Sequence, residues 1–290
     1  MPAPIDSSPA ETSAETSAAL NLDDIALPDA IQRVLAAQRA EDSKAPPLDP
    51  DALESTLLLV DLGRQRDRVQ GSLLARVCGQ GDRRHRDGAA EPASATDSAA
   101  LNGALRELRG QHKLLAACAR GSGGMLACVA HMAQTGNVGV ALNVDLLVTG
   151  GDGVSDGRMD SGEVKNWTQQ VSGRRAEQTL RALFSEEAGA VLQIRTADRA
   201  AVMQVLRDHG LSRCTSFIGK TRPQAAATDQ GKGALTIWRD ATQIFGATLE
   251  QIARADFDLS SSGGQAQSDA TAKRKPETRE EKIRALKMGL

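Results

Sequence analysis

A glycine turn is the first feature of this sequence whose residue types and spacing suit the binding of an anion. It reads Arg120-Gly121-Ser122-Gly123-Gly124, and the segment MLACVAHMAQTG after it predicts a helix. Backbone N–H groups and the positive end of a helix dipole attract anions at such a position. A dinucleotide-binding fingerprint would need a strand before the glycines, whereas the preceding segment predicts a helix. The sequence therefore argues against a dinucleotide site and leaves Arg120 and the backbone N–H groups to attract an anion.

An acidic, glycine-rich loop is the second candidate. Its residues at positions 1, 5, 6, 9 and 12 match a calcium-binding loop: Asp152, Asp156, Gly157, Asp160 and Glu163. Position 3 is Val154, which offers no side-chain oxygen. The segment before the loop also predicts a strand, whereas an EF-hand needs a helix on both sides. A solvated acidic insertion is the preferred interpretation, and calcium binding is the alternative.

No catalytic triad can be identified among the remaining polar residues. The four histidines have no evident nucleophile or metal-ligand partners. His112 and His131 are expected to be structural residues on helices, His209 to lie at a helix end where a cation is favourable, and His85 to lie in a charged loop. Glu186 and Glu187 are adjacent in the chain. They therefore cannot share one helical face as a catalytic acid/base pair would.

The cysteine pattern indicates a reduced protein. The chain has four cysteines without CxxC or Cys/His spacing: Cys78, Cys118, Cys128 and Cys214. Three of them lie in stretches that predict apolar helix or strand. We therefore interpret them as reduced core residues.

Composition argues against several classes of function. The 290 residues are 40% hydrophobic and 25% charged, which is ordinary for a globular protein. Aromatic residues make up only 2%, with no Tyr, and the formal net charge is −2. Stacking platforms for single-stranded nucleic acid are thus nearly absent, and electrostatic capture of nucleic acid or anionic membranes is disfavoured. Because no run reaches the ~18 apolar residues of a bilayer span, we expect a cytoplasmic protein without nucleic-acid or membrane partners.

Alternating helix and strand signals must position the turn. TLLLVDLG is a continuous apolar run of strand length, and VGVALNVDL alternates as a strand. Between residues 99 and 119, helical spacing connects Leu101, Leu105, Leu108, His112 and Leu115, which predicts one long helix up to the glycine turn. From about Arg174 the order is helix, strand, helix, three strands and helix. This interleaving predicts an α+β fold in which helices cover a mixed sheet.

Composition also divides the chain. Residues 1–48 are expected to be a mostly disordered tail with one short amphipathic helix, LPDAIQRVLAAQRAE, loosely attached through a Pro-rich segment. The domain is expected over residues 56–255, with residues 150–173 inserted into it. Residues 258–290 are expected to form a linker and a charged tail.

Several of these segments together resemble phosphoribosylformylglycinamidine synthase, the large glutamine- and ATP-dependent ligase of purine biosynthesis. The resemblance is carried by LLLVDLG, GSLLARV, KLLAACARGSGGMLACVAHMAQTGNVGV, LRALFSEEAGAVLQIR, ADRAAVMQVLRDHGL, FIGK and LTIWRDATQIFGATL. It covers about Leu57 to Ile252, less two loops. It corresponds to the C-terminal subdomain of the second aminoimidazole-ribonucleotide-synthetase-like half, and it implies that fold.

The resemblance breaks down at the glycine turn. The family typically reads His-Asp-Arg-Ser-Asp-Gly-Gly-Leu there, and the resemblance implies that the first Asp ligates Mg²⁺ and the Ser contacts a nucleotide. In this chain Ala119 stands at the metal-ligand position, Gly121 replaces the Ser, and Ser122 replaces the second Asp. The family uses ATP and Mg²⁺, but we expect only a degenerate nucleotide site at residues 120–124, no metal ligand and no cofactor here.

Two functions remain open from the sequence. One is a fragment or subunit of the synthase, which contributes to purine biosynthesis only with other synthase chains or halves. The other is a degenerate paralogue that acts as a non-enzymatic scaffold. The glutaminase domain and the first synthetase half are not found in this sequence, so we expect no catalysis by this chain alone.

Overall fold

The computed structural model describes residues 22, 25–39, 45–50, 54–78, 89–148, 167–222 and 233–254. The helices in this part of the chain are α1 (Leu27–Arg39), α2 (Leu73–Val77), α3 (Ala95–Gly110), α4 (Gly124–Gly136), α5 (Asp145–Val148), α6 (Trp167–Phe184), α7 (Arg199–Asp208) and α8 (Leu249–Arg254). The strands are β1 (Ser55–Asp61), β2 (Ala116–Ala119), β3 (Gly139–Asn143), β4 (Gly189–Arg195), β5 (Thr215–Arg222), β6 (Ala234–Arg239) and β7 (Thr242–Thr248).

The strands form one seven-stranded sheet in the order β2-β4-β1-β5-β3-β6-β7. Neighbouring strands are antiparallel except for β3 and β6, which are parallel. β1 is buried along its whole length, as its unbroken apolar run predicts. The predicted α+β fold with a mixed sheet and covering helices is therefore confirmed.

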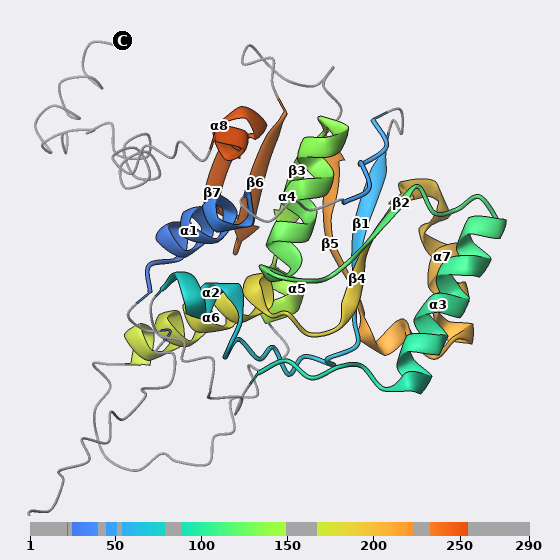
Figure 1. Ribbon diagram of the computed structural model, residues 1–290, viewed down its shortest axis with the longest axis horizontal. Coiled ribbons are helices and arrows are strands. Elements are labelled where there is room, and N and C mark those ends of the chain that lie inside the picture. Colours follow the sequence, from blue (N-terminus) through green and yellow to red (C-terminus); the bar gives the residue numbers. More distant parts are fainter. Residues whose placement is uncertain are drawn as a thin grey trace, which may run out of the picture.

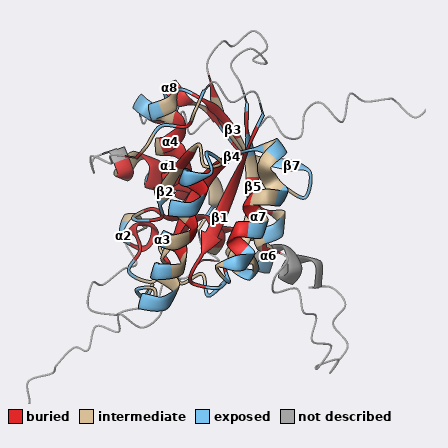
Figure 2. Ribbon diagram, turned by 90° about the vertical axis from the view of Figure 1, so that its right-hand side faces the viewer, coloured by how far each residue is buried: buried red, intermediate tan, exposed pale blue. Residues whose placement is uncertain are grey.

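Helices cover the two faces of the sheet unequally. Alternate residues of β1 point to opposite faces: Leu57 and Leu59 belong to the larger core, and Leu58 and Val60 to the smaller one. Helices α1, α2, α4, α6 and α8 contribute to the larger core, while α3 and α7 contribute to the smaller one over β4 and β1. Figure 1 shows α3 and α7 side by side and apart from the other helices, and Figure 2 shows that the strands are largely buried while the helices also have exposed faces.

The sequence analysis expected the first helix to be loosely attached, and this expectation is wrong. α1 begins at Leu27 as predicted. Its residues Ile31 and Val34 are fully buried and lie in the larger core, together with Leu48 from the Pro-rich segment. The apolar face of the amphipathic helix therefore packs on the domain rather than standing apart from it.

The predicted long helix over residues 99–119 is also wrong. α3 runs from Ala95 to Gly110, begins at the N-cap Ser94, and is followed by a turn and by strand β2. His112 adopts a left-handed φ of 54°, which the helical pattern at Leu108 and Leu115 does not reveal. Gly110 has low helix propensity, and the left-handed conformation of His112 cannot continue an α-helix.

Two further boundaries differ from the sequence analysis. The predicted strand VGVALNVDL ends at Asn143, and helix α5 follows it. α6 begins at Trp167, seven residues before the predicted start at Arg174, so the end of the expected insertion belongs to a helix. The calcium-like loop 152–163, residues 1–21 of the expected N-terminal tail, and the expected linker and charged tail over residues 258–290 lie outside the described residues.

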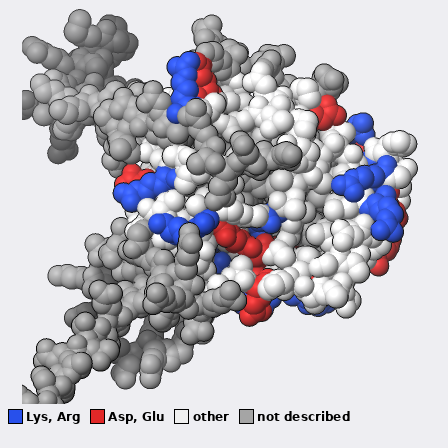
Figure 3. Space-filling view, in the orientation of Figure 1, with Lys and Arg blue, Asp and Glu red and all other residues white. Residues whose placement is uncertain are grey.

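The surface shows no concentration of one charge sign in the view of Figure 3, where described basic and acidic side chains lie in small mixed groups. Within the described residues, no helix is both long and apolar enough to cross a membrane.

Candidate functional site

The glycine turn connects strand β2 to helix α4. Gly123 and Gly124 have left-handed φ angles of 77° and 70°, which glycine adopts without steric cost. A Cβ on Gly124 would come within 2.7 Å of the backbone oxygen of Leu183, whereas a Cβ on Gly121 would meet nothing within 4 Å. The glycine pair is therefore required by the backbone, while Gly121 is not.

A strand, not a helix, precedes the turn, so the reason given above against a dinucleotide site is wrong. The sheet provides another reason. A dinucleotide-binding βαβ unit needs neighbouring parallel strands around its helix. Among the described strands, β2 pairs with β4 alone, antiparallel, and three strands (β4, β1 and β5) separate β2 from β3. The strand, turn and helix here therefore do not form that unit.

An internal carboxylate accepts a hydrogen bond from the N–H group of Gly123 in the turn. Glu186 Oε1 accepts hydrogen bonds from the backbone N–H of Gly123 at 2.8 Å and from that of Leu73 at 2.7 Å. Gly123 is the N-cap of α4 and Leu73 is the first residue of α2. One oxygen thus satisfies donors at the starts of two helices, where a negative charge is electrostatically favourable.

Arg120 is buried, and its guanidinium is fully inaccessible. It forms an ion pair with Asp61 at the end of β1 and donates to the backbone oxygens of Glu187 and Ala188. Asp61 in turn accepts hydrogen bonds from the N–H groups of Gly63 at 3.1 Å and Gln65 at 2.7 Å. The group that the sequence analysis assigned to an anion therefore joins three segments of the fold.

A second buried ion pair lies beside the first. Glu187 is fully buried and accepts two hydrogen bonds from Arg68, at 2.5 Å to Nε and 3.0 Å to Nη2. Arg68 also contacts Glu91 at 2.7 Å. The hydrogen bonds with Glu187 and Glu91 raise the pKa of Arg68 above its ordinary value. This bidentate geometry is the strong form of a carboxylate–guanidinium pair.

The residues at the turn do not fit a Mg²⁺-bound nucleotide. Ala119, at the family's metal position, is the exposed last residue of β2 and has no oxygen in its side chain. Among the described residues, no three His, Cys, Asp or Glu side chains lie close enough to hold a metal ion. Ser122 accepts a hydrogen bond from Arg76 at 3.2 Å. Magnesium requires oxygen ligands, and the turn offers none from a carboxylate.

The histidines and cysteines do not join this site. His112 was predicted on a helix but lies in the turn after α3. His131 lies on α4, and burial lowers its pKa. His209 is the C-cap of α7 and contacts Glu107 at 3.0 Å. His85 lies outside the described residues. The four cysteines are free, and Cys128 is buried while the other three are half-buried.

The sequence analysis missed the acidic partners of the turn. Asp61 closes a buried apolar strand, which is the one signal that could have marked it. Glu186 and Glu187 were rejected as a catalytic pair on the assumption that they lie on a helix, but α6 ends at Phe184. They lie in the connection to β4, where adjacent side chains reach different partners.

Comparison with a family model agrees with the fold. A family model described as AIR synthase related protein, C-terminal domain, matches residues 56–230. Phosphoribosylformylglycinamidine synthase II from Thermotoga maritima is 12% identical, with a TM-score of 0.44 over 72% of this chain and 27% of that chain. The T. maritima protein complexed with FGAR is 13% identical, with a TM-score of 0.45 over 73% and 29%.

Another solved structure, hydrogenase maturation protein HypE, is 13% identical, with a TM-score of 0.42 over 71% of this chain and 56% of that chain. This chain spans about a quarter of the length of the first synthase structure. The family match covers more than half of the chain and includes β1 through β5. The chain therefore belongs to the family of AIR synthase related proteins, whose C-terminal domain it contains.

Proposed function

We propose that the chain is a non-catalytic subunit of an assembly of the phosphoribosylformylglycinamidine synthase type, in which other synthase chains would supply the purine-biosynthetic chemistry. The proposal is carried by the glycine turn, whose N–H of Gly123 already holds the carboxylate of Glu186. A phosphate would have to displace that carboxylate. It would gain no metal bridge from Ala119 and no contact from the buried guanidinium of Arg120.

The free energies available at the turn are too small for tight nucleotide binding. An exposed helix N-terminus contributes ~0.3–1 kcal/mol to anion binding, whereas a micromolar complex requires ~8 kcal/mol. Displacement of Glu186 would also deprive the N–H of Leu73 of its hydrogen-bond acceptor. We therefore expect ATP and ADP to bind more weakly than about millimolar, whether or not Mg²⁺ is present.

The uncovered part of the sheet supports a role in association. A groove of about 690 Å³ crosses β5, β3 and β6, and Phe217, Trp238 and Leu146 line it. Leu146 has 57% of its surface exposed and is the one large hydrophobic side chain so exposed among the described residues. In this proposal, the groove is the surface that contacts another chain. The same groove favours the alternative of a degenerate paralogue that acts as a scaffold.

Calorimetric titration with ATP and ADP, with and without Mg²⁺, tests the loss of the nucleotide site. The wild type is compared with the double reversion Ala119→Asp, Gly121→Ser. Both positions are exposed, and Gly121 has room for a Cβ, so the reversion is expected to fold. Tight Mg²⁺-dependent binding by the wild type would contradict the proposal, whereas a gain confined to the reverted protein would support it.

An activity assay separates the subunit from the scaffold. The purified chain alone is expected to show no glutamine- or ammonia-dependent ATP turnover with formylglycinamide ribonucleotide. As a subunit, it should restore turnover to synthase chains that lack this domain. Turnover by the chain alone would refute the non-catalytic proposal, and failure to restore turnover would favour the scaffold.

A further inference from the structure

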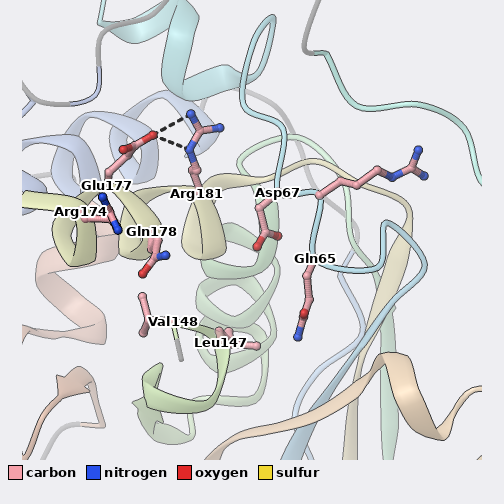
Figure 4. Close-up of a pocket in the computed structure, with 9 residues that line it drawn as sticks. Gln65, Asp67, Leu147, Val148, Arg174, Glu177, Gln178 and Arg181 are labelled. Atoms are coloured by element: carbon pink, nitrogen blue, oxygen red, sulfur yellow. Dashed lines mark hydrogen bonds and ion pairs between the residues drawn. The ribbon is translucent and has the colours of Figure 1, made fainter. Parts of the chain in front are cut away.

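A separate cavity lies between the loop after β1 and the helices α5 and α6. Its volume is about 370 Å³, and its lining includes Gln65 and Asp67 from the loop, Leu147 and Val148 from α5, and Arg174 and Gln178 from α6. Figure 4 shows these side chains around the cavity. None of residues 120–124 lines it. Its volume lies within the ~300–1,000 Å³ range of small-molecule sites.

One face of α6 provides the polar wall of the cavity. Arg174, Glu177, Gln178 and Arg181 are spaced by three or four residues, so they lie on the same side of the helix. Glu177 accepts from Nε and Nη2 of Arg181, both at 2.8 Å. Within the described residues, Arg174 and the second amino group of Arg181 form no ion pair. This wall therefore carries two guanidinium groups against one carboxylate, and Asp67 on the opposite wall adds a second carboxylate at the cavity.

The same wall holds an acceptor without a donor. Gln178 Oε1 is buried and has no hydrogen-bond partner among the described residues. A buried polar atom without a hydrogen-bond partner is unfavourable, because it has lost its contact with water and gained none in return. A hydroxyl group that entered the cavity and reached this oxygen would remove that cost.

The opposite wall is held in an unfavourable backbone conformation. Arg64, Gln65 and Asp67 have left-handed φ angles of 54°, 62° and 42°. Residues in this conformation are strained, and they tend to cluster at functional sites. The hydrogen bond from Gln65 N–H to Asp61 and the ion pair of Arg68 with Glu187 fix the loop. The fold thus maintains the position of Asp67 at the cavity.

We propose that this cavity binds a small organic anion that also carries hydroxyl groups. Arg174 and the free amino group of Arg181 would contact its phosphate or carboxylate group, as guanidinium groups do. Gln178 Oε1 and the carboxylate of Asp67 accept hydrogen bonds from its hydroxyl groups. Leu147 and Val148 provide the apolar floor. This site does not depend on the proposed subunit function, because it uses none of the residues of the glycine turn.

Calorimetric titration of the full chain with three-carbon probes tests the site. Glycerol 3-phosphate carries a phosphate and hydroxyl groups, glycerate carries a carboxylate and hydroxyl groups, and glycerol carries no anion. We expect at least one of the two anions to bind and glycerol to bind at least tenfold more weakly. The anion that binds more tightly identifies the oxyanion preferred. If neither anion binds at about 10 mM, the proposal is overturned.

Matched variants locate the binding. Arg174→Gln removes one exposed charge from α6 and should weaken binding of the anion about tenfold. Arg106→Gln removes a similar exposed charge from α3 and should leave binding unchanged. Gln178→Leu should weaken glycerol 3-phosphate severalfold but leave ethyl phosphate, which lacks the hydroxyl groups, unchanged. Equal losses for Arg174→Gln and Arg106→Gln would show that the anion binds elsewhere. Equal losses of both phosphates in Gln178→Leu would contradict the assigned contact between Gln178 and the hydroxyl groups.

Discussion

The carboxylate of Glu186 accepts a hydrogen bond from the backbone N–H of Gly123 at 2.8 Å, across 63 residues of sequence. The same oxygen accepts from the N–H of Leu73. The chain thus supplies its own anion at the turn where the family resemblance implies a nucleotide contact. A site that is filled in this way contributes to folding, and it does not need a ligand to satisfy its donors.

Removal of this carboxylate should destabilise the fold measurably. Glu186→Ala leaves two backbone N–H groups without their acceptor, and we expect a loss of about 2–3 kcal/mol in the free energy of unfolding. Urea denaturation measures it, with the exposed Glu54→Ala as the control. Sulfate should raise the melting temperature of Glu186→Ala more than that of the wild type. Equal stability of Glu186→Ala and Glu54→Ala would contradict the capping role.

The pair of Asp61 and Arg120 should be strongly coupled. Arg120→Met leaves a buried carboxylate without its cation, and we expect a cost of about 3–5 kcal/mol in unfolding free energy. The double variant Asp61→Asn, Arg120→Met should cost less than the sum of the two single variants, because neither charge is then left alone. A double-mutant cycle by urea denaturation measures this. Additivity within about 0.5 kcal/mol would show that the ion pair contributes nothing.

The two ends of the glycine turn should respond differently to alanine. Gly124→Ala places a Cβ within 2.7 Å of the backbone of α6 at a left-handed φ, and we expect a loss of at least about 2 kcal/mol. Gly121→Ala meets open space and should change stability by less than about 0.5 kcal/mol. Thermal unfolding of both variants compares them directly. A similar loss at both positions would mean that the turn is not fixed by this close approach.

The sheet was predictable where the signal is local. The unbroken apolar run of β1 and the order of elements from α6 to α8 follow from periodicity and length alone. β2 was missed because its four residues, mostly alanine, continue the helical leucine spacing of the preceding segment. It forms a strand by pairing with β4, and the paired residues Ala117 and Leu192 are 75 positions apart in the sequence by subtraction of their numbers. A window of local sequence does not contain that partner.

The site was predictable in part for a similar reason. The glycine turn is visible in the sequence, because left-handed backbone requires particular residues. Its partners are not visible, because Asp61 and Glu186 are 59 and 63 residues from the groups they contact. Arg120 was interpreted as available to a ligand. Its burial depends on the approach of β1 and the segment after α6, which only the three-dimensional structure brings together.

The last prediction concerns pH and the carboxyl group of Asp67. Burial, with a smaller contribution from Asp61, raises its pKa from 3.8 to about 6, and Glu187 acts in the same direction while Arg120 and Arg181 oppose it. The folded state therefore binds this proton more tightly than the unfolded state, so ionisation disfavours folding. The contribution of Asp67 to stability should be greatest below about pH 4 and should fall as the pH rises to about 6.

Asp67→Asn isolates this effect, because asparagine adopts the left-handed φ of 42° readily and carries no charge. We expect the variant and the wild type to be equally stable near pH 4. At pH 7 the variant should be more stable by about 1–2 kcal/mol, a value reduced from the full shift because the group is partly solvated. Urea denaturation between pH 4 and 7 measures the difference. Asp208→Asn, at the exposed end of α7, controls for the loss of one carboxylate. A difference between Asp67→Asn and the wild type that stays constant across this range would show that Asp67 does not titrate there.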